Sequence, residues 1–248
     1  MFENRQLFDF EVEPETGKAR VLDAPCAPDG ELASIGLDCS NLNAALTKLV
    51  RTRSISSNRV DLGEILEGFG VRSAVELALM GHGASLTDHF WYRAPGSLAR
   101  WEDVNFFDND WDATFCASIL ASQYDGLAAC SPDIPDITTA GHLRKAWERR
   151  DAGIFLLKQA QRDDGADLVG SLLASQLCAR LFGRDTYQPL SMREVNGKRF
   201  SASPLMLARD EELVQSHRLY AMCGMQRRKR TRSRHLPLCK PLPTPSRT

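Results

Sequence analysis

The dipeptide Asn196-Gly197 separates two short runs of sequence, YQPLSMREV and KRFSASPLM. Asn-Gly readily adopts the two left-handed backbone conformations that a two-residue hairpin turn requires, so it is the strongest short-range signal for a β-hairpin. The chain is therefore expected to fold back on itself here as two antiparallel strands.

The residues before this hairpin predict a loop, two strands and a helix. Residues 131–147, SPDIPDITTAGHLRKAW, have the prolines and the glycine of a loop that leads into a strand. Residues 153–158, GIFLLK, form a short apolar run that begins with Gly, which favours a buried strand over a helix. A double apolar stripe at helical spacing over 168–181, ended by Gly183, predicts a helix.

The first 130 residues predict a mixed α/β segment of their own. Alternation in QLFDFEVE, followed by a PETG turn, predicts a β-hairpin at about residues 6–23. Ser73 and Glu76 have the spacing of a capping box and predict the start of a helix. Other helices are expected over 41–49, 62–69 and 112–122.

The composition is that of an ordinary globular protein, with 43% hydrophobic and 25% charged residues among 248. No apolar run approaches the roughly 20 residues of a membrane span, and the N-terminus lacks the features of a secretory signal. Seven scattered cysteines without a CxxC pair argue against a disulfide framework and a zinc knuckle. We therefore expect a cytoplasmic protein with no membrane association.

The charge is unevenly distributed along the chain. The net charge is −1, but residues 226–248 contain eight Lys or Arg and no acid. The rest of the chain carries 23 basic and 32 acidic residues, a balance of −9. We divide the chain into residues 1–130, residues 131–215, and a basic Pro-rich tail over 216–248 that is expected to be disordered.

The element order over 131–215 is that of a protein-kinase-like N-lobe. In such a lobe, a Gly lets backbone N–H groups approach phosphate oxygens, and a strand lysine adds a positive charge for the α- and β-phosphates. Gly141 and Lys158 fit these roles, provided that both converge on one pocket. The alternative for Lys158 is a solvated lysine at a strand end. The expected fold class is α+β, with an antiparallel sheet plus helix after the mixed α/β segment.

The amino-acid sequences of several segments resemble motifs of a known family. SLTDHFWYR, WEDVNFFDNDW and SPDIPDITTAGHLRKAW followed by FLLK are similar to motifs of HipA-like proteins of bacteria and their mobile elements. The resemblance covers about residues 5–215. It implies a serine/threonine kinase with a phosphoinositide-kinase-like catalytic fold, and several such kinases act as toxins in toxin–antitoxin systems.

The resemblance also implies binding residues and partners. Carried over residue by residue, it assigns Thr138, Thr139, Gly141 and Lys145 to a phosphate-binding loop and Lys158 to the ATP-binding lysine. ATP is then the expected cofactor, and an antitoxin or another protein is the expected partner.

The sequence departs from the family pattern in two places. In GADLVGSLLASQL, Gly170 stands where a Glu would pair with the lysine, and Asp167 is the candidate substitute. After Leu213 only 35 residues remain, without an acid to serve as catalytic base or Mg²⁺ ligand. We therefore expect a truncated or frame-shifted relative that binds nucleotide, does not bind Mg²⁺ by itself, and lacks phosphoryl-transfer activity.

Two other interpretations remain open. The rings and acids of residues 85–111 most simply pack an irregular segment and cap its turns, and the alternative is a metal site at Asp108 and Asp110. The second functional hypothesis is a non-enzymatic regulatory protein of a mobile element or toxin–antitoxin system, whose basic tail contacts nucleic acid.

Overall fold

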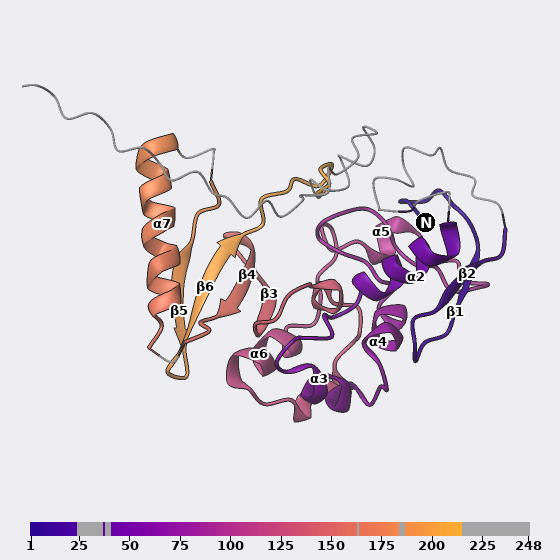
Figure 1. The fold of residues 1–248 in the computed structure, drawn as a ribbon, viewed down its shortest axis with the longest axis horizontal. Helices are drawn as coiled ribbons and strands as arrows, with labels where there is room; N and C mark the ends of the chain where they lie inside the picture. Colours follow the sequence, from indigo (N-terminus) through magenta and orange to yellow (C-terminus); the bar gives the residue numbers. More distant parts are fainter. Residues whose placement is uncertain (24–36, 38–40, 163, 184–186, 215–248) are drawn as a thin grey trace, which may run out of the picture.

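The protein is mixed α and β with two antiparallel sheets, in a computed structural model that describes residues 1–23, 37, 41–162, 164–183 and 187–214. A helical N-terminal part lies beside the four-stranded sheet, and α7 lies on the far side of that sheet (Figure 1). The tail over 216–248 that was predicted to be disordered lies outside the described residues.

The N-terminal part combines a small hairpin with short helices. Its strands and α-helices are β1 (Phe10–Val12), β2 (Ala19–Val21), α2 (Leu42–Thr52), α3 (Leu62–Phe69), α4 (Ala74–Met80), α5 (Trp101–Val104) and α6 (Thr114–Ala121). Two short 3-10 helices follow, η2 (Asp125–Ala129) and η3 (Pro135–Thr138). The Ser73 side chain accepts a hydrogen bond from the Glu76 N–H at 2.9 Å, which fixes the start of α4 as predicted. The carboxylate of Glu76 instead accepts from the Arg72 N–H, so only half of the expected capping box forms.

The second sheet has the strand order β3-β4-β6-β5 and is antiparallel throughout. Its strands are β3 (Lys145–Arg150), β4 (Gly153–Gln159), β5 (Ser191–Val195) and β6 (Lys198–Pro204), with α7 (Ala166–Phe182) between β4 and β5 in the chain. Asn196 and Gly197 connect β5 to β6 with φ of 52° and 72°. The hairpin predicted at this dipeptide is therefore confirmed, with the left-handed turn that its residues favour.

The largest apolar core contains residues from both sides of the predicted boundary at 130. It joins Phe115, Ile119 and Leu77 of the helical part to Leu157 and Phe200 of the sheet, and all five are buried. The face of the sheet that carries Leu157 thus packs on the N-terminal part, so the two predicted regions share one core. The division of the chain at 130 remains a prediction about sequence organisation.

The ring-rich segment over 85–111 packs as predicted. Trp91, Trp101 and Phe106 are buried in one apolar cluster with Trp147 of β3. The amide of Asn105 caps the following turn, because its Oδ1 accepts from the N–H groups two and three residues later. The rings therefore fasten an irregular segment to the edge of the sheet.

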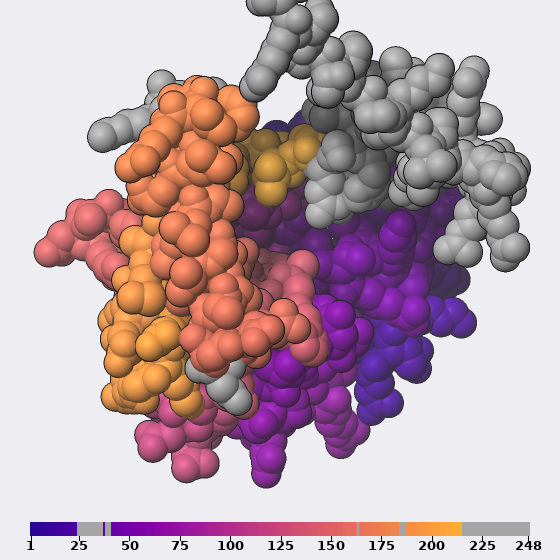
Figure 2. All heavy atoms as spheres, turned by 60° about the vertical axis from the view of Figure 1, so that its left-hand side comes forward, coloured from indigo at the N-terminus to yellow at the C-terminus, as the bar shows by residue number. Residues whose placement is uncertain are grey.

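Helix α7 covers the sheet with only part of its surface. Leu168 and Ser175 are buried, whereas Leu173 and Leu177 are 65% and 56% exposed. Figure 2 shows α7 as a ridge on the outside of the molecule. Of the two predicted apolar stripes, one is therefore left uncovered in this chain.

Residues after β6 return to the N-terminal part as a strap. The Leu205 N–H donates to the Ile154 carbonyl at 2.8 Å, and the Leu213 N–H donates to the Thr87 carbonyl at 2.8 Å. His89 donates from Nε2 to the Arg209 carbonyl at 2.8 Å. These contacts connect the end of the sheet to the ring-rich segment.

Within the described ranges, no helix combines the length and the apolar character needed to cross a bilayer.

Candidate functional site

The loop between η3 and β3, residues 139–144, contains Thr139 and Gly141 of the residues expected to bind phosphate, and Thr138 and Lys145 flank it. Its N-terminal anchor is buried, because Ile134, Pro135 and Ile137 all lie in the interior. Its C-terminal end is Lys145, the first residue of β3. The loop residues Ala140, Gly141 and His142 are exposed. The loop is thus held at both ends and open in the middle.

The hydroxyl groups of the two threonines contact carbonyl groups of the protein. Thr138 Oγ1 lies 3.1 Å from the Ala84 carbonyl and 3.2 Å from that of Pro135. Thr139 Oγ1 donates to the Asp136 carbonyl. Each hydroxyl has a single hydrogen, so neither can donate to a ligand without giving up its present contact. In this structure, the threonines stabilise the start of the loop.

Gly141 permits a close approach of the Lys145 ammonium. Its φ of +107° is a conformation that side chains rarely adopt, and an added Cβ would lie 2.6 Å from Lys145 Nζ. The ammonium reaches back along the loop and donates to the Ala140 carbonyl at 2.6 Å. A residue other than glycine would therefore disturb both the backbone and the position of this charge.

Lys145 and Lys158 face each other across the β3–β4 pair, since they are direct partners in its register. Side chains directly opposite in an antiparallel pair have Cβ atoms about 5 Å apart. The structure thus brings Gly141, Lys145 and Lys158 to the same end of the sheet. Lys158 is exposed, and its ammonium has no hydrogen-bonding or ion-pair partner among the described residues.

Burial lowers the pKa of Lys145 from 10.5 to about 8, because the ammonium loses solvation. The positive charges of Arg59 and Lys158 lower this pKa further, and the carboxylate of Asp61 opposes them. Lys145 thus experiences two other positive charges and one carboxylate. An anion that bound between the lysines would relieve their repulsion.

The loop also offers backbone donors. The N–H groups of residues 140–143 donate to no acceptor within the described part of the chain. Successive free N–H groups beside positive side chains are the arrangement that binds phosphate in many proteins. The loop and the two lysines together therefore form a candidate anion site.

The prediction that Asp167 pairs with Lys158 is wrong. The carboxylate of Asp167 accepts from the N–H groups of Gln161 at 2.8 Å and Arg162 at 3.1 Å. Asp167 lies in the first turn of α7, so its carboxylate reaches back to backbone donors in the turn that precedes the helix. Gly170 lies on an open face of α7, where an added Cβ would meet nothing within 4 Å.

Two buried acids near the loop were missed by sequence reasoning. Asp61 forms a buried ion pair with Arg59, whose Nε lies 2.6 Å from Asp61 Oδ1. Asp136 accepts from the Trp147 N–H at 2.8 Å, and burial raises its pKa from 3.8 to about 7. No pattern in the sequence indicated burial at either position. Arg59 and Asp61 are close in the chain, but the Tyr124 partner of Asp61 is 63 positions away. Asp136 accepts from a backbone N–H.

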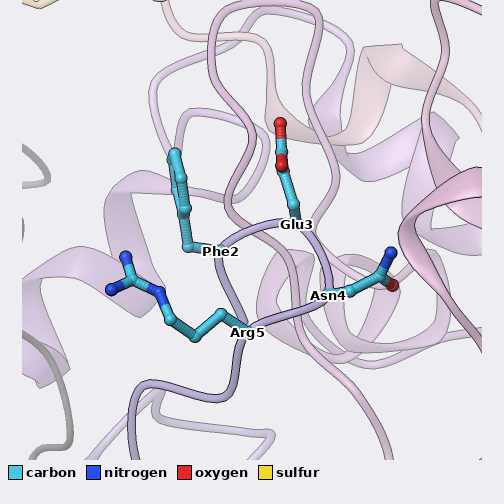
Figure 3. A pocket seen from close by; sticks show the side chains of 4 residues that line it. All are labelled: Phe2, Glu3, Asn4 and Arg5. Atoms are coloured by element: carbon cyan, nitrogen blue, oxygen red, sulfur yellow. The ribbon is translucent and has the colours of Figure 1, made fainter.

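The candidate residues do not line the surface hollows found elsewhere. A hollow of about 680 Å³ lies at Phe2–Arg5 (Figure 3), where Asn4 donates to Glu102 at 2.9 Å. A second, of about 420 Å³, lies beside Trp111 and Arg149, and a third, of about 800 Å³, lies against the β1–β2 hairpin. None of these includes the loop 139–144 or either lysine.

The alternative metal site has no support in the described residues. Asp108 lies 2.6 Å from Arg209, and Asp110 lies 3.1 Å from Arg149, so each carboxylate has its own cation. No group of three or more His, Cys, Asp or Glu side chains in the described ranges could hold a metal ion. Residues 226–248, which carry the nucleic-acid hypothesis, lie outside those ranges.

Comparisons with known proteins do not place the chain in a family. No family model, curated protein or solved structure matches it.

Proposed function

We propose that this chain is a HipA-like kinase homologue whose loop 139–145 and Lys158 bind the phosphates of ATP. The observation that carries the proposal is the convergence of Gly141, Lys145 and Lys158 at one end of the sheet. A kinase-like N-lobe needs a Gly-bearing loop and a strand lysine on the same side of the nucleotide. The motifs that resemble HipA-like proteins supply the residues of both parts.

The electrostatics support a phosphate ligand over a neutral one. Lys145 is a buried ammonium whose pKa is lowered towards neutrality, and the exposed Lys158 lies opposite it. Bringing an anion to such a pair strengthens the charged form of both lysines. Binding of ATP is therefore expected to raise the pKa of Lys145.

Binding is proposed without phosphoryl transfer. The chemistry requires an acid to accept the proton of the substrate hydroxyl and acids to hold Mg²⁺. Asp136 is buried against β3, and Asp61 is held by Arg59, so neither is free to take these roles. We therefore propose a nucleotide-binding protein, with an antitoxin or another protein as its partner.

A thermal-shift experiment tests nucleotide binding. Millimolar ATP is expected to raise the melting temperature of the wild-type protein, both with and without Mg²⁺, and to have little effect on Lys158→Met. Lys48→Met is the matched control, because Lys48 is an exposed lysine on α2. An equal shift in all three proteins would place the binding elsewhere, and no shift in any of them would remove nucleotide binding from the account.

A further inference from the structure

Residues 58–61 lie directly against the candidate phosphate-binding loop. The Val60 N–H donates to the His142 carbonyl at 3.0 Å. In the opposite direction, His142 donates from Nδ1 to the Asn58 carbonyl at 2.6 Å. These residues are 82 and 84 positions apart in the chain. A segment of the N-terminal part thus holds the exposed middle of the loop through two reciprocal hydrogen bonds.

Arg59 holds the end of the same loop. Its side chain is fully buried and donates from an NH2 group to the Lys145 carbonyl at 2.9 Å. The carbonyl of Lys145 belongs to the first residue of β3, so this bond fixes where the loop ends and the strand begins. The direction of the Lys145 side chain follows from that backbone position.

Asp61 supplies the carboxylate that pairs with Arg59. Its Oδ1 accepts from Arg59 Nε at 2.6 Å, and its Oδ2 accepts from the Tyr124 hydroxyl at 3.0 Å. Arg144, in the loop, lies with Nε 3.9 Å from the same Oδ2. Asp61 therefore fixes the direction of the Arg59 guanidinium and attracts a cation of the loop.

Stability alone is a poor reason for this arrangement. Burying an ion pair costs each partner its solvation, and an apolar pair of similar size is often equally stable. The NH1 group of Arg59 is also buried without a hydrogen-bond partner among the described residues, which adds to the cost. What the pair provides, and an apolar pair could not, is a directed hydrogen bond to the start of β3.

We propose that the buried Arg59–Asp61 pair positions the loop 139–145 for phosphate binding, without touching the ligand. This inference rests on the proposed function for its ligand, but its geometry is a property of the free protein. Arg59 fixes the position of the backbone at Lys145, and Asp61 fixes the orientation of the Arg59 side chain. The N-terminal part thereby controls the shape of a site that lies in the next region of the chain.

The two members of the pair act on Lys145 in opposite electrostatic directions. The charged groups that influence Lys145 are Arg59, Lys158 and Asp61. Arg59 lowers the pKa of Lys145 and Asp61 raises it. Arg59→Gln is thus expected to raise the pKa of Lys145, and Asp61→Asn is expected to lower it. A variant that merely loosened the fold would expose Lys145 and raise its pKa in both cases.

An experiment on the full chain measures both the pKa of Lys145 and the binding of pyrophosphate. The pKa of Lys145 is followed by NMR of ¹³C-labelled lysine without ligand, with Lys145→Arg to assign the signal. The dissociation constant for inorganic pyrophosphate is measured by calorimetry. The variants are Arg59→Gln, Asp61→Asn and Arg59→Lys, and the control is Arg72→Gln, which alters an exposed ion pair with Glu15.

The expected result is opposite pKa changes in Arg59→Gln and Asp61→Asn, with pyrophosphate binding about tenfold weaker in both. Pyrophosphate binding to Arg72→Gln stays at the wild-type level. If either variant fails to fold, Arg59→Lys decides. It keeps the charge but loses the bond to the Lys145 carbonyl, and an unchanged dissociation constant would overturn the proposal.

The outcomes separate this inference from the proposed function. Changes of the pKa in the same direction in both variants would assign the pair to general stability and overturn the inference. Opposite pKa changes without any pyrophosphate binding, even to the wild type, would support the control of Lys145 by the pair and contradict the proposed function.

Discussion

Gly141→Ala tests the role of the loop, because the change has two separable consequences, one for stability and one for ligand binding. The φ of +107° at Gly141 is unfavourable for alanine, and such backbone strain costs about 1–3 kcal/mol. The new Cβ would also lie 2.6 Å from Lys145 Nζ, the flexible end of a side chain that can move away at little cost. Backbone strain therefore dominates the loss of stability, and displacement of Lys145 dominates the loss of binding.

Gly153→Ala is the matched control for this prediction. Gly153, at the start of β4, has a φ of +121°, and an added Cβ there would meet nothing within 4 Å. Both variants are expected to lower the free energy of unfolding by about 1–3 kcal/mol in urea denaturation, since both suffer backbone strain. Only Gly141→Ala is expected to weaken ATP binding, as measured by calorimetry.

Two results would refute this reasoning. Equal weakening of ATP binding in both variants would assign the effect to general destabilisation. Unchanged ATP binding in Gly141→Ala would show that the Lys145 ammonium and the loop backbone take no part in binding.

Three further predictions concern the surroundings of the site. Asp136→Asn keeps the hydrogen-bond acceptor for Trp147 and removes the ionisable group. Because burial raises the pKa of Asp136 to about 7, ionisation of this carboxyl disfavours the folded state. The wild type is therefore expected to lose about 3 kcal/mol of stability between about pH 5 and pH 8, and the variant is expected to retain it. Equal pH slopes in denaturant unfolding would contradict this. Leu168→Ala is expected to cost about 2–5 kcal/mol, whereas Leu173→Ser costs less than about 1 kcal/mol, because only Leu168 is buried; equal costs in urea unfolding would show that the outer face of α7 is covered. Ser73→Ala removes the cap of α4 and is expected to cost about 1 kcal/mol, and an unchanged thermal midpoint would argue against the cap.

Local signals in the sequence were sufficient for most of the elements. The Asn-Gly turn, the cap at Ser73 and the helical spacing over 62–69 each act over a few residues, and the structure forms the hairpin and the helices there. These features depend on neighbouring residues, which a single sequence displays directly. The pairing of Lys145 with Lys158 was not predicted, because the register of β3 with β4 is seen only in the folded chain.

Long-range contacts explain what the sequence did not reveal. Arg59 meets the Lys145 carbonyl across 86 positions, and no local pattern marks such a contact. Asp167 was expected to pair with Lys158, but its carboxylate accepts from backbone donors in the turn before α7. Periodicity found both apolar stripes of α7, yet only packing decides which stripe is covered. Side chains that serve a distant partner thus require the folded chain.

The central claim is that the loop 139–145 and Lys158 form one phosphate-binding site. The most direct measurement is an NMR titration with ATP of the full chain, in which backbone amides and lysine side chains are both labelled. The account predicts that the largest chemical-shift changes occur at residues 139–145 and at Lys158, and that the pKa of Lys145 rises from about 8. Changes confined to other regions, or a saturable signal that leaves both lysines unaffected, would contradict it.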